Sequence, residues 1–303
     1  MQIKKFMSVS KAIYYPAHKY NQGRCVMLES LIKFHELQDK PVLIFIWTLI
    51  LSSVAILFSA QLSYIVYHGG TLFDMSGLFA VMFTIIPSIY FFTMIIKRRE
   101  REEEREIEKH YSKNFWNKHS KDIIMFLVFF FGISISFAFW SFFMPPDFFQ
   151  VQMIKISQMR GTAMPTGAMI EGAFLSDFSM ILGNNLQVMF FAFLFSFVFG
   201  AGAIFIIVWN ASILGVYLGQ YSKAIWNIPF WHIPFSLLFL PHAVPEIAGY
   251  ICAALAGGLI SAAIIRKNNS KVFSIILFDS IRVLILGILL IVIGAGMEVF
   301  LTF

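Results

Sequence analysis

The stretch LPHAVPEIAGYICAALAGGLISAAII, residues Leu240 to Ile265, decides the fold of this chain. It exceeds the roughly 20 mainly apolar residues that a helix needs to cross a membrane, although a histidine, two prolines and a glutamate stand at its start. Small residues then recur at every fourth position, at Gly249, Ala253, Gly257 and Ser261. In lipid, such a row lets two helices approach closely and predicts a packing face. His242 and Glu246 extend the row, so we expect both to point into a helical bundle.

The prolines and the glutamate also predict where this helix begins. Pro245 suits the first turn of a helix, where its missing N–H would have no helical partner in any case, so we expect a start near Val244. Glu246 then lies at the helix N-terminus, where the macrodipole favours a negative charge. We interpret His242 as a structural residue that bonds either Glu246 or a neighbouring helix end.

The composition of the whole chain is that of a membrane protein. Hydrophobic residues make up 58%, aromatic residues 17% and charged residues only 13%, and the mean hydropathy is +0.76. A single soluble core could not bury so much apolar surface. The net charge of +6 does not indicate nucleic-acid binding, because most lysines and arginines fall in two segments beside the predicted spans. We therefore predict an all-α polytopic membrane bundle, in contact with membrane lipids and without a nucleic-acid partner.

The apolar runs predict about seven membrane crossings, one of them interrupted. Six are continuous, within residues 42–67, 75–96, 123–144, 186–209, 244–265 and 272–303. The interrupted one covers Ala211 to Leu240 and contains several polar residues and prolines.

The positive charges predict the orientation of these crossings. Residues 1–41 and the stretch from Lys97 to Lys121 are rich in lysine and arginine, so we expect both to be cytoplasmic. The connection Pro145 to Gly183 carries few positive charges and is expected outside, as an amphipathic interfacial segment. The short basic loop after Ile265 should return to the cytoplasm, which requires the interrupted stretch to cross and leaves the C-terminus external.

We divide the chain accordingly into four parts. These are a cytoplasmic N-terminal arm (1–41), a first membrane hairpin (42–96), a charged cytoplasmic loop (97–122) and a membrane core domain (123–303) that includes the external interfacial segment 145–183. The charged loop has acids and bases three and four residues apart, which can extend the second helix into the cytosol.

Three asparagines stand beside the predicted spans. Asn184 and Asn185 immediately precede Leu186, where an amide oxygen can cap the exposed backbone amides of the fourth helix. Asn210 is expected at a bend before the interrupted span, bonded to another helix or acting as a cap.

Further pairs of small residues predict other close contacts between helices. Gly215 and Gly219 form one pair, and Gly200 and Gly202 form another. We expect the face that carries Gly257 to contact the segment around Gly215.

Two quoted stretches together resemble a known family. NNLQVMFFAFLFSFVFGAGAIFIIVWNASILGVYLG, followed after a short gap by LPHAVPEIAGYICAALAGGLISAAI, resembles the stage II sporulation protein M family. Members show an Asn pair opening one membrane helix, an Asn-small-x-x-x-Gly turn and a Pro-His-Gly-x-x-Glu box opening a small-residue helix. The specific match covers Asn184 to Ile265, and Ala243 and Ala211 stand where the family usually has glycine. The opening VMLESLIKFHELQDKPVLIFIW is similar to the start of the archaeal branch.

The resemblance implies a function through partners. The namesake of the family is similar to a membrane anchor for a cell-wall-degrading complex in spore-forming bacteria. We therefore expect a multi-pass cell-membrane scaffold or anchor that binds partner proteins or a second copy of itself. Under this interpretation the polar and motif residues hold the fold, and we assign no catalytic residue, no metal ligand and no cofactor.

Two other classes of function stay open. A transporter or channel-like protein could use Asn210, His242 and Glu246, and the polar residues Asp279, Arg282 and Glu298 of the last span could join them, although Asp279 and Arg282 are spaced to pair with each other. A metal-dependent intramembrane enzyme could take two ligands from His242 and Glu246 at i,i+4 spacing and a third from His232. No established catalytic motif supports the enzyme.

Overall fold

The computed structural model shows a bundle of long helices. It describes residues 40–66, 75–108, 115–162, 171–200, 202–225, 240–265 and 270–302. The elements are α2 (Pro41–Val66), α3 (Ser76–Glu108), α4 (Phe115–Phe143), the 3₁₀ turn η1 (Pro146–Phe149), α5 (Gln150–Thr162), α6 (Glu171–Phe199), α7 (Ala203–Ile225), α8 (Leu240–Ile265) and α9 (Ser270–Thr302). Among them, 7 helices are long and apolar enough to cross a membrane. The prediction of an all-α polytopic bundle is confirmed.

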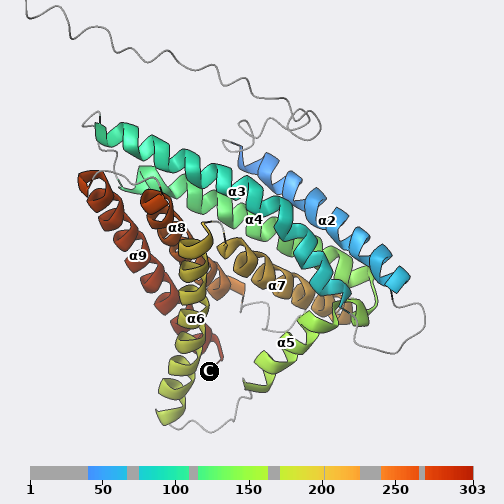
Figure 1. Ribbon diagram of the computed structural model, residues 1–303. Helices are drawn as coiled ribbons and strands as arrows, with labels where there is room; N and C mark the ends of the chain where they lie inside the picture. The colour runs from blue at the N-terminus through green and yellow to red at the C-terminus, as the bar shows by residue number, and fades with distance from the viewer. Residues whose placement is uncertain are drawn as a thin grey trace, which may run out of the picture.

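The helices pack in two groups. In the first, α2 packs against α3 and α4, and α4 packs closely against α7; in the second, α8 packs against α6 and α9. Figure 1 shows α6, α8 and α9 on one side of the bundle and α2, α3 and α4 across from them. Phenylalanines join α3 to α4, where Phe92 stacks on Phe126 with ring centroids 4.3 Å apart. Of the seven candidate spans, α8 is the most deeply buried, so its side chains contact protein far more than lipid.

Contacts between helices show the relative direction of several spans. Ser53 of α2 contacts Ser136 of α4 at 3.1 Å, and a turn earlier on each helix Thr48 contacts Gly132, so α2 and α4 are parallel. Contacts of the same kind make α4 parallel to α7, α6 parallel to α8, and α8 antiparallel to α9. These directions agree with seven successive spans. The fifth candidate span, Ala203–Ala224 in α7, overlaps both the predicted fourth span and the predicted interrupted stretch, and residues 226–239 of that stretch lie outside the described residues.

The fourth and fifth spans differ from the prediction in position. Helix α6 begins at Glu171, so the last residues of the segment expected outside, up to Gly183, belong to this helix. Its break comes at Gly200, whose φ of 69° lies in the left-handed region that glycine adopts without strain. The bend expected at Asn210 is wrong, because α7 continues through that residue without interruption.

The start of α8 was also predicted too late. The helix begins at Leu240, four residues before Val244, so Pro245 lies inside it. Pro245 cannot donate the hydrogen bond that the Pro241 carbonyl would receive in a regular helix. Glu246 lies beyond the first turn, where the effect of the macrodipole has largely decayed. The position of Glu246 therefore depends on its side-chain contacts more than on the helix end.

The small residues of α8 are buried as predicted, but their partners differ. A Cβ at Gly249 would lie 2.9 Å from the Gly287 carbonyl oxygen of α9, and a Cβ at Gly257 would lie 2.5 Å from the Phe193 carbonyl oxygen of α6. Four residues advance a helix by about 40° beyond one full turn, so a row with this spacing turns from one neighbour to the next. The buried residues Ala253 and Ser261 belong to the same row.

The other glycines singled out in the sequence lie against α4, against the end of α6, or against no atom. A Cβ at Gly215 would lie 2.4 Å from the Ser134 carbonyl oxygen of α4, and Gly219 approaches the same helix. The expected contact between Gly257 and the segment around Gly215 is therefore wrong. Gly202 lies close to the Phe195 carbonyl within the break, whereas a Cβ at Gly200 would meet no atom within 4 Å. Gly200 thus serves backbone conformation and not helix packing.

Two helical elements extend beyond the candidate spans. The span of α3 ends at Met94, but the helix continues to Glu108, which confirms that the charged loop extends this helix. Helix α5, which follows η1 in the chain, lies at the other end of α3. There the Gln152 amide of α5 donates a hydrogen bond to the Gly77 carbonyl of α3 at 3.0 Å. Helix α5 is therefore fixed to the bundle. The N-terminal arm 1–39 and the basic loop after Ile265 lie outside the described residues.

Candidate functional site

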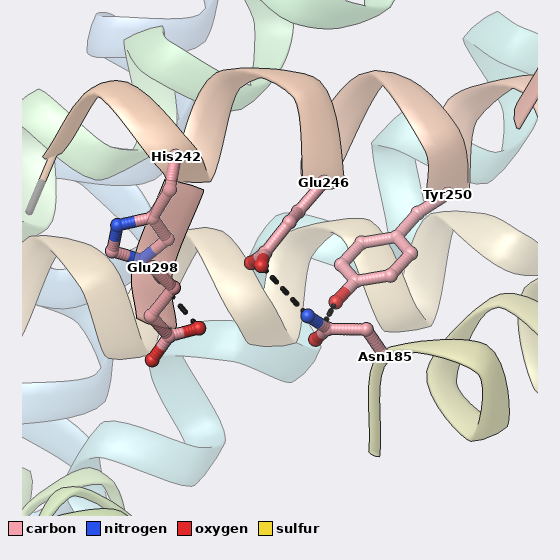
Figure 2. Close-up of polar contacts among 5 residues, drawn as sticks. All are labelled: Asn185, His242, Glu246, Tyr250 and Glu298. Carbon is pink, nitrogen blue, oxygen red and sulfur yellow. Dashed lines mark hydrogen bonds and ion pairs between the residues drawn. The ribbon is translucent and has the colours of Figure 1, made fainter. Parts of the chain in front are cut away.

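A buried polar cluster lies where the first turns of α8 meet α6 and the end of α9. Figure 2 shows His242, Glu246 and Tyr250 in successive turns of α8, all directed to the same side. Their spacing of four residues puts them on one face of the helix. Glu246 is 9% exposed and Tyr250 7%. The prediction that His242 and Glu246 point into the bundle is confirmed.

Asn185 of α6 connects this face to the neighbouring helix. Its Nδ2 donates a hydrogen bond to Glu246 Oε1 at 2.7 Å, and its Oδ1 accepts one from the Tyr250 hydroxyl at 2.6 Å (Figure 2). The predicted capping role is wrong, because α6 begins fourteen residues earlier and Asn185 lies well inside it. The neighbouring Asn184 is exposed. Of the Asn pair, only Asn185 therefore takes part in the cluster.

Glu298 brings a second carboxylate from α9. Its Oε2 lies 4.0 Å from His242 Nε2 (Figure 2). The close approach of α8 and α9 here depends on Gly294, one turn before Glu298, because a Cβ at that position would lie 2.5 Å from Glu246 Cγ. Any larger residue would push the Glu246 side chain away.

The cluster offers one nitrogen and two carboxylate ligands. Each of His242, Glu246 and Glu298 contributes one possible ligand atom, and these three atoms lie within 4.8 Å of one another. Ionisable groups inside membrane spans are costly to bury and mark functional sites. The arrangement can bind a cation or exchange a proton, and it can also fix the relative position of three helices.

The part of the chain that contains the cluster is also the part that resembles known proteins. Residues 80–303, which include the whole cluster, match the family model for stage II sporulation protein M. The chain belongs to the stage II sporulation protein M family. An uncharacterized protein of the archaeon Methanocaldococcus jannaschii is 31% identical over 130 residues, which cover 42% of this chain and 71% of that protein. No solved structure matches the chain.

Other residues singled out in this stage II sporulation protein M family member lie apart from the cluster. Asn210 donates its amide hydrogen bond to the Ile206 carbonyl of its own helix at 2.8 Å. Arg282 and Asp279 contact each other at 3.1 Å, as their spacing predicted. His232, considered as a third ligand only under the alternative of a metal-dependent enzyme, lies outside the described residues.

Tyr250 and Gly294 are the site residues that the sequence analysis missed. Both could have been recognised from their spacing, since Tyr250 lies one turn after Glu246 and Gly294 lies one turn before Glu298. A search for helical neighbours of each polar residue in a span would have found them. Asn185 was found, but with a different role.

Proposed function

We propose that this protein is an integral membrane scaffold that holds partner proteins at the membrane. The family supports an integral membrane protein of the stage II sporulation protein M type. The observation that carries the proposal is that one helix, α3, joins helical elements beyond the candidate spans at both of its ends. Its start holds α5 through Gln152, and its far end continues beyond the span to Glu108.

The charge of the α3 extension favours a protein as its partner. From Lys97 to Glu108 the sequence has five basic and six acidic residues, so the extension has almost no net charge. Helices that bind anionic lipid surfaces carry an excess of lysine and arginine. A helix with interspersed charges of both signs suits a polar protein surface better, because each charge can meet an opposite one there.

Site-specific crosslinking in cells tests this proposal. A photo-crosslinking amino acid replaces Arg105 of the α3 extension in the full-length chain, and a matched control carries it at Ile86, which is 68% exposed on the membrane part of the same helix. We expect a discrete protein adduct at Arg105 and none at Ile86. Lack of an adduct at Arg105, or the same pattern at both positions, would contradict the scaffold.

A transport function is the second candidate, favoured by the placement of His242, Glu246 and Glu298 inside the bundle. The hydrogen bond that the structure describes for Asn210, the third residue considered for transport, stays within α7. Purified chain in lipid vesicles would then support cation flux that Glu298→Gln reduces. Flux equal to that of empty vesicles would exclude this candidate and leave the scaffold unaffected.

A further inference from the structure

We propose that His242, Glu246 and Glu298 form a binding site for one divalent transition-metal cation of the Zn²⁺ or Mn²⁺ type. This inference goes beyond the scaffold and does not depend on it. The three side chains come from two antiparallel helices that lie in close contact, so the backbone already holds the ligands near one another.

The geometry needs only side-chain adjustment to reach coordination. Zinc binds nitrogen and carboxylate oxygen at about 2.0–2.2 Å, which places neighbouring ligands of a tetrahedral site roughly 3.3 Å apart. Here the His242 nitrogen and the Glu298 oxygen are 4.0 Å apart, and the whole set lies within 4.8 Å. Rotation about the side-chain torsions of the two glutamates covers such a difference without moving the helices.

A second layer of hydrogen bonds supports one of the ligands. Asn185 donates to Oε1 of Glu246, which leaves the other oxygen of that carboxylate to face a cation. The Tyr250 hydroxyl in turn fixes the Asn185 amide. Metal-ligating carboxylates are characteristically held in this way, because the outer partners orient the ligand and are needed for full affinity.

The charges of the site match a divalent cation. Two carboxylates close together in a low-dielectric interior repel each other strongly when both are ionised. A divalent cation with neutral histidine as the third ligand brings the net charge of the site to zero. The histidine nitrogen favours zinc or iron over magnesium and calcium, which prefer oxygen ligands, and the two carboxylates also suit manganese.

The position of the cluster gives a cation a way in. His242 lies near the start of its candidate span and Glu298 near the end of its own, so the site is at one end of the bundle. The side chains of His242 and Glu298 keep 16% and 29% of their surface exposed. Three protein ligands also leave a fourth position for water, as in zinc sites that are open to exchange.

Metal binding by the purified full-length chain in detergent tests the proposal. After treatment with a chelator and its removal, Zn²⁺ is added and bound metal is measured by equilibrium dialysis with elemental analysis. We expect one Zn²⁺ per chain, and a loss of affinity of at least about tenfold in His242→Gln and in Glu298→Gln. Asp279→Asn is the matched control, since it removes a carboxylate of α9 that pairs with Arg282, and it should bind like the parent.

A second measurement keeps the test decisive if a variant folds poorly. Glu298→Gln keeps the shape of a partly exposed side chain, so it should stay monodisperse in gel filtration. Zn²⁺ should raise the midpoint of thermal unfolding of the parent and of Asp279→Asn, but not that of Glu298→Gln. Absence of stoichiometric Zn²⁺ and of a thermal shift in the parent overturns the site, and so does equal binding by the parent and a folded Glu298→Gln.

Discussion

The contact between α6 and α8 predicts a large effect from a single added methyl group, in Gly257→Ala. A Cβ at Gly257 would lie 2.5 Å from the Phe193 carbonyl oxygen and 3.0 Å from the Phe197 nitrogen, and both atoms belong to the backbone of α6. Ordinary contact begins near 3.4 Å, so the two helices would have to separate by about 0.9 Å locally. Side-chain rotation cannot relieve a clash with backbone atoms.

The magnitude follows from comparison with a glycine that has free space. Gly183→Ala on α6 is the control, because a Cβ there meets no atom within 4 Å. Both substitutions gain about 1 kcal/mol of helix propensity, and only Gly257→Ala adds overpacking, which costs about 1–3 kcal/mol. The midpoint of thermal unfolding should therefore be lower in Gly257→Ala than in Gly183→Ala by about 2–4 °C for each kcal/mol.

Tryptophan fluorescence of the purified chain during heating in detergent measures both midpoints under one condition. The difference between the two variants is the quantity of interest, because it cancels the shared gain in propensity. Equal midpoints, or a higher one for Gly257→Ala, would refute the reasoning and show that α6 and α8 are not in backbone contact at this point.

Three further predictions use the same chain. Asn185→Ala should lower the free energy of unfolding by about 1–3 kcal/mol for each of the two buried groups that lose a hydrogen bond, while Asn184→Ala should change it by less than about 0.5 kcal/mol in the same heating assay. Gly200→Ala should destabilise by about 1–2 kcal/mol despite open space, because its φ of 69° disfavours L residues; an unchanged midpoint would contradict this. A membrane-impermeant maleimide applied to intact cells should modify a cysteine at Gln158 but not one at Glu104, and the reverse pattern would overturn the predicted orientation.

The fold class could be predicted because most spans are recognisable as long apolar runs. The boundaries of α6 could not, since the residues before Asn184 are mixed in polarity and the Asn pair has the composition of a helix cap. A buried asparagine inside a membrane helix is acceptable only when tertiary partners satisfy it. Those partners, Glu246 and Tyr250, are on a helix formed much later in the sequence.

The candidate site was predictable for the residues that share a helix. His242 and Glu246 could be assigned to one inward face from their spacing, and the same spacing predicted that the row ending at Ser261 is buried. The neighbour of each face could not be assigned, because the register between helices depends on packing of whole surfaces. Glu298 was therefore recognised only as a polar residue of the last span, and its place beside His242 needed the structure.

The order of helices in the two packing groups has a consequence for synthesis of the protein. The chain builds α2, α3 and α4 in one group, places α6 in the other, returns to the first with α7 and goes back with α8 and α9. Asn185 is made 61 residues before Glu246, which at about 5–20 residues per second is a wait of roughly 3–12 s on the ribosome. During that time the Asn185 side chain lacks the two partners that satisfy it in the folded protein. A nascent chain that stops before α8 lacks the helix that makes the main contact with α6, so its Asn185 amide has neither Glu246 nor Tyr250 as a partner.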